Sequence, residues 1–84
     1  MKLLKLPQVL GLTAKSRTSH YTDIKEGLMT PPVRLSIHSV AWPEQEITAI
    51  NTARIAGKSN EEIRALVRNL VAARARGADA PMAA

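Results

Sequence analysis

Two consecutive prolines, Pro31 and Pro32, divide this chain into two parts joined by irregular backbone. A proline has no N–H to donate and its ring fixes φ, so a pair of prolines cannot lie inside a helix or in the middle of a sheet. We therefore expect residues 28–32 to form a loop. A helical pattern precedes this loop, and a strand pattern follows it directly at Val33.

The segment RLSIHSVAW, residues 34–42, has the pattern of a tight β-hairpin. If Leu35 pairs with Val40, then Val33 pairs with Trp42, and directly opposed residues share a face of the hairpin. This register places these four apolar side chains on one face, with Trp42 as the main core anchor. The residues expected on the outer face are Arg34, Ser36, Ser39 and Ala41.

An isoleucine occupies the turn of this hairpin. A two-residue type I′ turn needs positive φ at both Ile37 and His38, which a β-branched residue resists. A four-residue loop, Ser36 to Ser39, keeps the same register without that strain. Within its own hairpin, Ile37 has no evident apolar partner.

Two short helices are expected before the loop. Pro7 suits the first turn of a helix that Gly11 keeps short. Ser16 is a good N-cap for a second helix, which Gly27 would end. Two short helices joined by a turn of three or four residues are typical of a helix-turn-helix. Tyr21 and Ile24 are expected on the inner face of the second helix, with His20 beside them.

Two further helices are expected after the hairpin. Pro43 opens the third, and Glu44 and Glu46 suit the positive end of that helix. Ser59 and Glu62 have the spacing of a capping box at the start of the fourth. The apolar stripe of the fourth helix consists of Ile63, Leu66, Val67, Leu70 and Val71. This helix is expected to stop at Gly77.

The fold predicted from this order is mainly α with a small β-hairpin: a winged helix-turn-helix followed by two C-terminal helices. With 84 residues, the chain forms a single domain over residues 1–76, and the unpatterned residues 77–84 form a disordered tail. The sequence has no cysteine and no apolar run long enough to cross a membrane, which fits a cytoplasmic protein without membrane contact.

Enzymatic chemistry finds little support in the sequence. His20 and His38 have no cysteine or carboxylate near them at metal-ligand spacing, so no metal is expected. The four glycines are scattered and form no phosphate-binding loop. So small a chain also has little room for a buried pocket of drug-like size. We therefore expect no catalytic residue, no cofactor and no small-molecule ligand.

The charge of the chain points to a polyanionic partner. The net charge is +5, and residues 1–42 hold six basic and two acidic residues. Nucleic acid is the commonest partner of a small basic domain. A recognition helix presents its N-terminal residues to base edges and phosphates. Candidate DNA contacts are Lys15, Ser16, Arg17, Thr18, Ser19, His20, Thr22 and Lys25 on the second helix, and Arg34, Ser36, His38 and Ser39 on the hairpin.

Among these candidates, Arg17 could pair with guanine, the commonest specific contact in the major groove. Ile37 could contact a groove wall, contact a neighbouring copy of the chain, or fold back onto its own domain. Ile37, Leu66 and Leu70 are candidate contacts for self-association. The arginines of the fourth helix, Arg64, Arg68, Arg74 and Arg76, are expected mainly in solvent.

The segments LPQVLGLTAKSR, HYTDIKEG, PPVRL and SVAWPEQEI, in this order, resemble the AlpA family of phage and mobile-element regulators. The resemblance runs from about Leu3 to Arg76, and the family is related to excisionases and to MerR-type winged helices. It implies a recognition helix over 16–26 and a wing over 33–42. The sequence departs from the family pattern at Thr22, where a basic residue is common, and at His20 or Asp23, where an aliphatic one is.

What the resemblance implies is binding to double-stranded DNA of an integrated element. The protein would act as a transcription regulator, as an excisionase that bends DNA and works with an integrase, or as both. A regulator would bind inverted half-sites as a dimer, whereas an excisionase would bind direct repeats head-to-tail. The alternative is a protein-binding adaptor that docks a partner on its apolar fourth helix.

Overall fold

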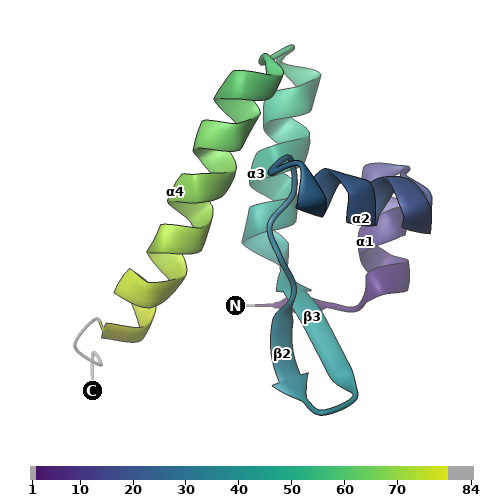
Figure 1. Cartoon of the computed structure of the whole chain (residues 1–84), viewed down its shortest axis with the longest axis vertical. Coiled ribbons are helices and arrows are strands. Elements are labelled where there is room, and N and C mark those ends of the chain that lie inside the picture. Colours follow the sequence, from purple (N-terminus) through teal and green to yellow (C-terminus); the bar gives the residue numbers. More distant parts are fainter. Residues whose placement is uncertain (1, 80–84) are drawn as a thin grey trace.

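The computed structural model describes residues 2–79 and shows a mainly helical fold with a small antiparallel sheet. The elements are β1 (Leu3–Leu4), α1 (Leu6–Thr13), α2 (Arg17–Lys25), β2 (Val33–Ser36), β3 (Ser39–Pro43), α3 (Glu44–Ile55) and α4 (Asn60–Asp79). In Figure 1, α4 runs beside α3, α1 and α2 lie on the other side, and the β2–β3 hairpin extends away from the helices. The winged helix-turn-helix fold is thus confirmed, and we call the β2–β3 hairpin the wing.

The helix-turn-helix forms where the local sequence signals place it. Pro7 lies in the first turn of α1, and Ala14 ends this helix with a positive φ of 58°. The Ser16 hydroxyl caps α2 by accepting a hydrogen bond of 3.1 Å from the Ser19 N–H. Gly27 follows α2 with a φ of 77°, a conformation that costs glycine little. The predicted cap and end of the second helix are therefore confirmed, and the first helix is short as expected, although it runs through Gly11 to Thr13.

The sheet contains a strand that the sequence pattern did not predict. Its order is β1-β3-β2, and β1 pairs antiparallel with β3 through Leu3 with Pro43 and Leu4 with Trp42. The strand β1 has only two residues, too few for a periodic pattern to identify. Its pairing makes β3 the central strand, so β3 is covered along both edges.

The register of the wing differs by one residue from the predicted one. Val33 pairs with Ala41, Arg34 pairs with Val40, and the ladder is irregular at Leu35. The bulge turns Leu35 outward, where 47% of it is exposed, whereas Ala41 is 1% exposed. The prediction that Leu35 is buried and Ala41 exposed was wrong. The irregularity on β2 changes which side chains of that strand face the core, whereas on β3 Trp42 stays buried and the neighbouring Ala41 is buried as well.

The turn of the wing contains two residues, Ile37 and His38, instead of the predicted four-residue loop. Neither has a positive φ, so the turn avoids the type I′ geometry that isoleucine resists. The Arg34 guanidinium donates a 3.2 Å hydrogen bond to the Ile37 carbonyl and thereby bridges the tip.

The core is built around Trp42, as predicted, and this side chain is fully buried. Its indole N–H donates a 2.9 Å hydrogen bond to the Thr30 carbonyl. The loop before the wing contributes Leu28 and Met29 to the core, which its proline-rich sequence does not suggest. The other buried apolar residues are Leu4, Val9, Ala41, Ile47, Ile50, Ile63 and Val67.

The fourth helix begins with the predicted capping box. The Ser59 N–H donates to the Glu62 carboxylate at 3.1 Å, and the Glu62 N–H donates to the Ser59 hydroxyl at 3.2 Å. These bonds lower the pKa of Glu62 below its usual 4.5. The helix continues to Asp79, past the predicted end at Gly77, so residues 77–79 of the expected tail are helical. Residues 80–84 of that tail lie outside the described part.

A buried ion pair joins α4 to the rest of the domain. Both carboxylate oxygens of Glu46 accept hydrogen bonds from Arg74, at 2.7 Å and 2.6 Å, and Arg74 also donates to the Pro31 carbonyl at 2.7 Å. The Glu46 side chain is only 6% exposed. Glu46 thus has a specific partner beyond the helix dipole, and Arg74 is not the solvated residue that we expected.

Candidate nucleic-acid interface

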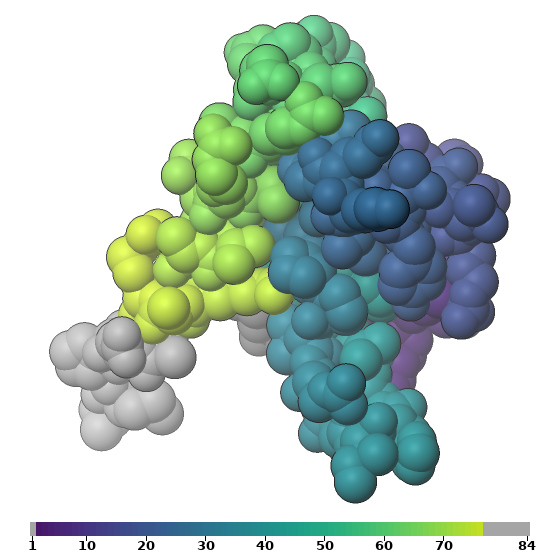
Figure 2. Space-filling model, viewed as in Figure 1, coloured from purple at the N-terminus to yellow at the C-terminus, as the bar shows by residue number. Residues whose placement is uncertain are grey.

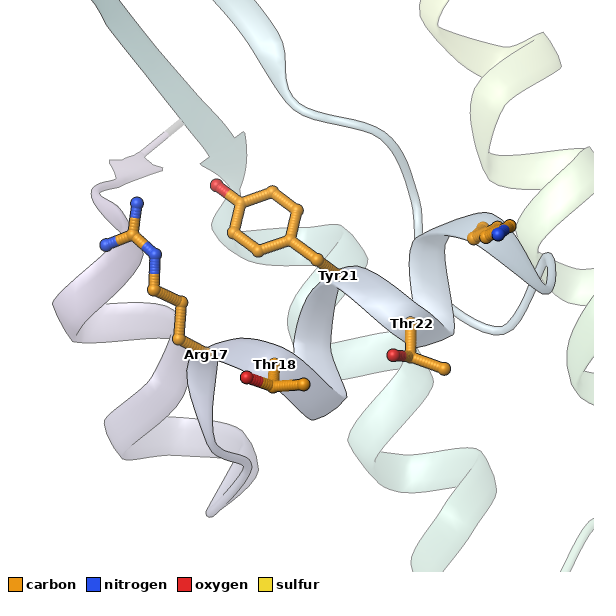
Figure 3. A pocket seen from close by; sticks show the side chains of 5 residues that line it. Arg17, Thr18, Tyr21 and Thr22 are labelled. Carbon is orange, nitrogen blue, oxygen red and sulfur yellow. The ribbon is translucent and has the colours of Figure 1, made fainter.

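One face of α2 is exposed along its whole length. Because an α-helix has 3.6 residues per turn, positions i, i+1, i+4, i+5 and i+8 form one continuous stripe. In α2 these positions are Arg17, Thr18, Tyr21, Thr22 and Lys25, and they line a shallow surface hollow (Figure 3). We call this stripe the α2 face. It contains two cationic side chains, two threonines, each with a hydroxyl and a methyl group, and one aromatic ring.

Two side chains of the α2 face lie against each other. The guanidinium carbon of Arg17 is 5.9 Å from the centre of the Tyr21 ring, within the range of a cation–π contact. Figure 3 shows both side chains projecting from the same side of α2. Tyr21 is 39% exposed, so our prediction that it faces inward was wrong. Its spacing of four residues from Arg17 could have revealed that the two share a face.

His20 is the predicted site residue that the structure contradicts, because its side chain is fully buried. The imidazole packs nearly perpendicular to the rings of Trp42 and Tyr21, with ring centres 4.9 Å and 5.3 Å away. It therefore cannot reach DNA in this conformation. Its inward position was hard to predict because α2 has few apolar residues, so polar side chains occupy part of its inner face.

The buried imidazole lacks polar partners. Neither ring nitrogen of His20 has a hydrogen-bond partner within residues 2–79. Burial lowers the pKa of His20 below its usual 6.5, because a charged ring would lose its hydration, and the carboxylate of Asp23 opposes this shift only in part. The ring is therefore neutral at pH 7.

Asp23 anchors α2 through ion pairs on its inner side. Its carboxylate lies 3.0 Å from the Lys15 ammonium and 3.6 Å from the Arg54 guanidinium. These contacts connect α2 to the preceding turn and to α3. Lys15, a predicted DNA contact, therefore already has an anionic partner, although about a third of its side chain remains exposed.

The other predicted contacts on α2 are at the surface. Ser16 and Ser19 are exposed at the N-terminus of the helix, where Ser16 acts as the cap. Unpaired backbone N–H groups at this end favour anions such as phosphate. Lys25 is exposed in the last turn of α2.

The wing presents most of its predicted site residues to solvent. Arg34, Ser36 and His38 are exposed, whereas Ser39 is half-buried and its hydroxyl accepts a hydrogen bond from the Lys5 ammonium. Ile37 is 80% exposed, so the alternative that it folds back onto its own core was wrong. In Figure 2 the surfaces of α2 and of the wing lie on one face of the molecule, with the wing extending beyond α2.

The apolar stripe of α4 is largely used inside the domain. Ile63 and Val67 are buried, and Leu66 and Leu70 are half-buried against the core. Arg64 donates to the Glu26 carbonyl at 2.9 Å and to Glu61 at 2.7 Å. Of the four arginines on this helix, Arg68 and Arg76 are the exposed ones. An adaptor function therefore has little free apolar surface on this helix.

Comparison with known proteins identifies the family. A sequence model described as Prophage CP4-57 regulatory protein (AlpA) matches residues 2–51, more than half of the chain and everything from β1 into α3. The chain belongs to the AlpA family. This is a family of phage regulatory proteins, and the match includes the α2 face and the wing but not α4.

A relative of this AlpA-family chain occurs in a phage. The two are 39% identical over 57 residues, and that protein is an uncharacterized one, ORF88, of Enterobacteria phage P4. The match covers 68% of this chain and 65% of the phage protein, slightly less than two thirds of its length. No solved structure matches the chain significantly. Within residues 2–79, no helix has the length and apolar character needed to cross a membrane.

Proposed function

We propose that this chain binds double-stranded DNA sequence-specifically and controls a prophage or a similar integrative element in the bacterial cytoplasm, where it would be associated with the nucleoid. The observation that carries the proposal is the α2 face, an exposed stripe of cationic and hydroxyl side chains on the second helix of a helix-turn-helix. Such a stripe has the dimensions and chemistry to enter a major groove.

Each part of the interface has its own task in this proposal. The α2 face enters the major groove, where Arg17 donates two hydrogen bonds to guanine. Lys25, the hydroxyls of Ser16 and Ser19 and the N-terminus of α2 bind phosphates and fix the register of the protein on the duplex. The wing reaches the neighbouring groove with Arg34, Ser36 and His38.

A DNA-binding protein of this kind can control an integrated element by either of two mechanisms. As a transcription regulator, the protein would bind inverted half-sites as a two-fold dimer. As an excisionase, it would bind tandem direct repeats, self-associate along the DNA, bend it and assist an integrase. The exposed Ile37 favours the second mechanism, because head-to-tail repetition needs an extra contact patch on each copy.

Selection of binding sites from random duplex DNA at near-physiological salt tests this function. We expect a short motif to be enriched, in direct copies for an excisionase and inverted copies for a dimeric regulator. Failure to enrich any motif would contradict sequence-specific binding.

Arg17→Ala tests which helix reads the sequence. On the enriched site, we expect this change to weaken binding by about 1–3 kcal/mol, because it removes a bidentate base contact. Titration of labelled DNA followed by fluorescence anisotropy gives the value. Arg68→Ala removes an exposed arginine from α4 and serves as the matched control, for which we expect no comparable loss. Equal losses in both variants would show that Arg17 contributes only charge.

A further inference from the structure

The aromatic ring on the α2 face is held in place from two sides. The Tyr21 ring packs nearly perpendicular to the buried His20 imidazole, with ring centres 5.3 Å apart and ring planes at 80°. The Arg17 guanidinium lies over the ring at 5.9 Å. A ring fixed in this way loses little conformational freedom when it makes a further contact, so it is preorganised for binding.

The contact with the Tyr21 ring also leaves the N–H groups of Arg17 free to donate hydrogen bonds. Arg34, Arg64 and Arg74 each donate hydrogen bonds to protein oxygens, whereas the contact found for Arg17 is with the ring of Tyr21. A guanidinium that packs on an aromatic ring keeps its N–H groups, which lie in its own plane, free to donate. Arg17 is therefore oriented by Tyr21 and still able to pair with two acceptors.

We propose that Arg17 and Tyr21 together read a thymine–guanine step in the major groove. Arg17 donates to O6 and N7 of the guanine, and the ring of Tyr21 contacts the 5-methyl group of the adjacent thymine. This inference rests on the proposed function, because it assigns the bases that the α2 face recognises. Tyr21 is thereby a specificity-determining residue that the sequence pattern did not suggest.

The chemistry of the groove selects these two bases. Guanine offers two acceptors on its major-groove edge, which match the arginine fork, and the thymine methyl is an apolar group exposed there. Side chains one helical turn apart start about 6 Å from each other along the helix. Because Arg17 and Tyr21 converge, their ends suit neighbouring base pairs, which are separated by about 3.4 Å.

Replacement of thymine by deoxyuridine tests the inference at the level of one methyl group. In the enriched site, each thymine next to a guanine is replaced in turn, and the dissociation constant is measured by fluorescence anisotropy at one salt concentration. We expect the wild-type protein to bind about four-fold more weakly when the contacted methyl is absent, which is the effect of burying one such group. Tyr21→Ala should bind thymine and deoxyuridine sites equally.

Two further variants test whether the ring of Tyr21, and not its hydroxyl or a neighbouring side chain, contacts the thymine methyl. Tyr21→Phe should keep the preference for thymine, because the ring and not the hydroxyl makes the contact. Thr22→Ala, which removes a methyl and a hydroxyl group from the same face, should also keep the preference for thymine, whatever its effect on the overall affinity. A preference that survives in Tyr21→Ala, or that is lost in Thr22→Ala or Tyr21→Phe, would overturn the inference.

The outcomes distinguish this inference from the proposed function. If the wild-type protein enriches a motif but shows no loss at any deoxyuridine beside a guanine, the inference fails while DNA reading stands. This measurement on the wild-type protein tests the inference even if Tyr21→Ala folds poorly. If no motif is enriched, both fail together.

Discussion

At the scale of single residues, His20 makes the stability of this protein depend on pH. The ring is buried without hydrogen bonds to the described residues, and burial lowers its pKa below 6.5 in the folded state. Below this pH the unfolded chain binds a proton at His20 that the folded protein excludes. Since the unfolded state then binds more protons, the contribution of His20 to stability is fully present above pH 6.5 and falls as the pH is lowered.

We therefore expect the midpoint of urea unfolding to decrease for the wild-type protein between pH 7 and pH 5. His20→Leu should remove most of this decrease, because leucine needs neither hydrogen bonds nor a charge in the same space. His38→Leu, at the exposed tip of the wing, is the matched control and should behave as the wild type does. Parallel pH profiles for all three proteins would assign the dependence to other groups.

At the scale of elements, local signals predicted the helices and the hairpin of the wing, but not the strand β1 or the register of the wing. The caps at Ser16, Gly27 and Ser59 each involve residues close in sequence, so the pattern alone places the helix ends. The pairing of β1 with β3 joins residues about forty positions apart, and the irregularity at Leu35 shifts the register of the wing by one residue. No short pattern encodes either feature.

The residues of the candidate site also divide into those predicted from the local sequence and those set by distant contacts. Arg17 and Thr18 were predicted as contacts from their place at the N-terminus of a recognition helix, and Thr22 and Lys25 from their place further round it; the structure puts all four on the exposed face of α2. The inner face of α2 was not predicted correctly. Its central residue is His20, and histidine occurs both in binding sites and in protein cores, so the sequence alone does not distinguish the two. The neutral state of His20 depends on the packing of Trp42, which belongs to a distant strand.

The tip of the wing gives a prediction at this same scale. Ile37 is 80% exposed and its carbonyl accepts a bond from Arg34, so its side chain is not needed for folding. We expect Ile37→Ser to leave the thermal midpoint nearly unchanged and to reduce cooperativity on DNA with several sites. Electrophoretic mobility shifts on one-site and three-site DNA measure this. His38→Ala is the matched control, and an equal loss of cooperativity in both variants would implicate the turn as a whole.

At the scale of the whole molecule, two arginines fix α4 to the domain besides its apolar stripe: Arg64, which donates to the Glu26 carbonyl, and Arg74. Arg74 joins the carboxylate of Glu46 on α3 to the carbonyl of Pro31 before the wing. It thus links the C-terminal helix to the segment that leads into the wing. The family match ends at residue 51 and so does not cover α4, which this connection fixes to the matched part of the domain.

Removal of Arg74 tests how far the molecule depends on this connection. Arg74→Met keeps an unbranched stem but leaves the buried Glu46 carboxylate unpaired, so we expect a loss of about 3 kcal/mol in the free energy of unfolding. Glu46→Gln combined with Arg74→Met removes both charges and should recover part of that loss, whereas Arg68→Met, at an exposed site on α4, should cost little. Chemical denaturation followed by tryptophan fluorescence reports on the core, because Trp42 lies at its centre. If the double variant were no more stable than Arg74→Met, the apolar contacts and the Pro31 bond, not the charge pair, would hold α4 on the domain.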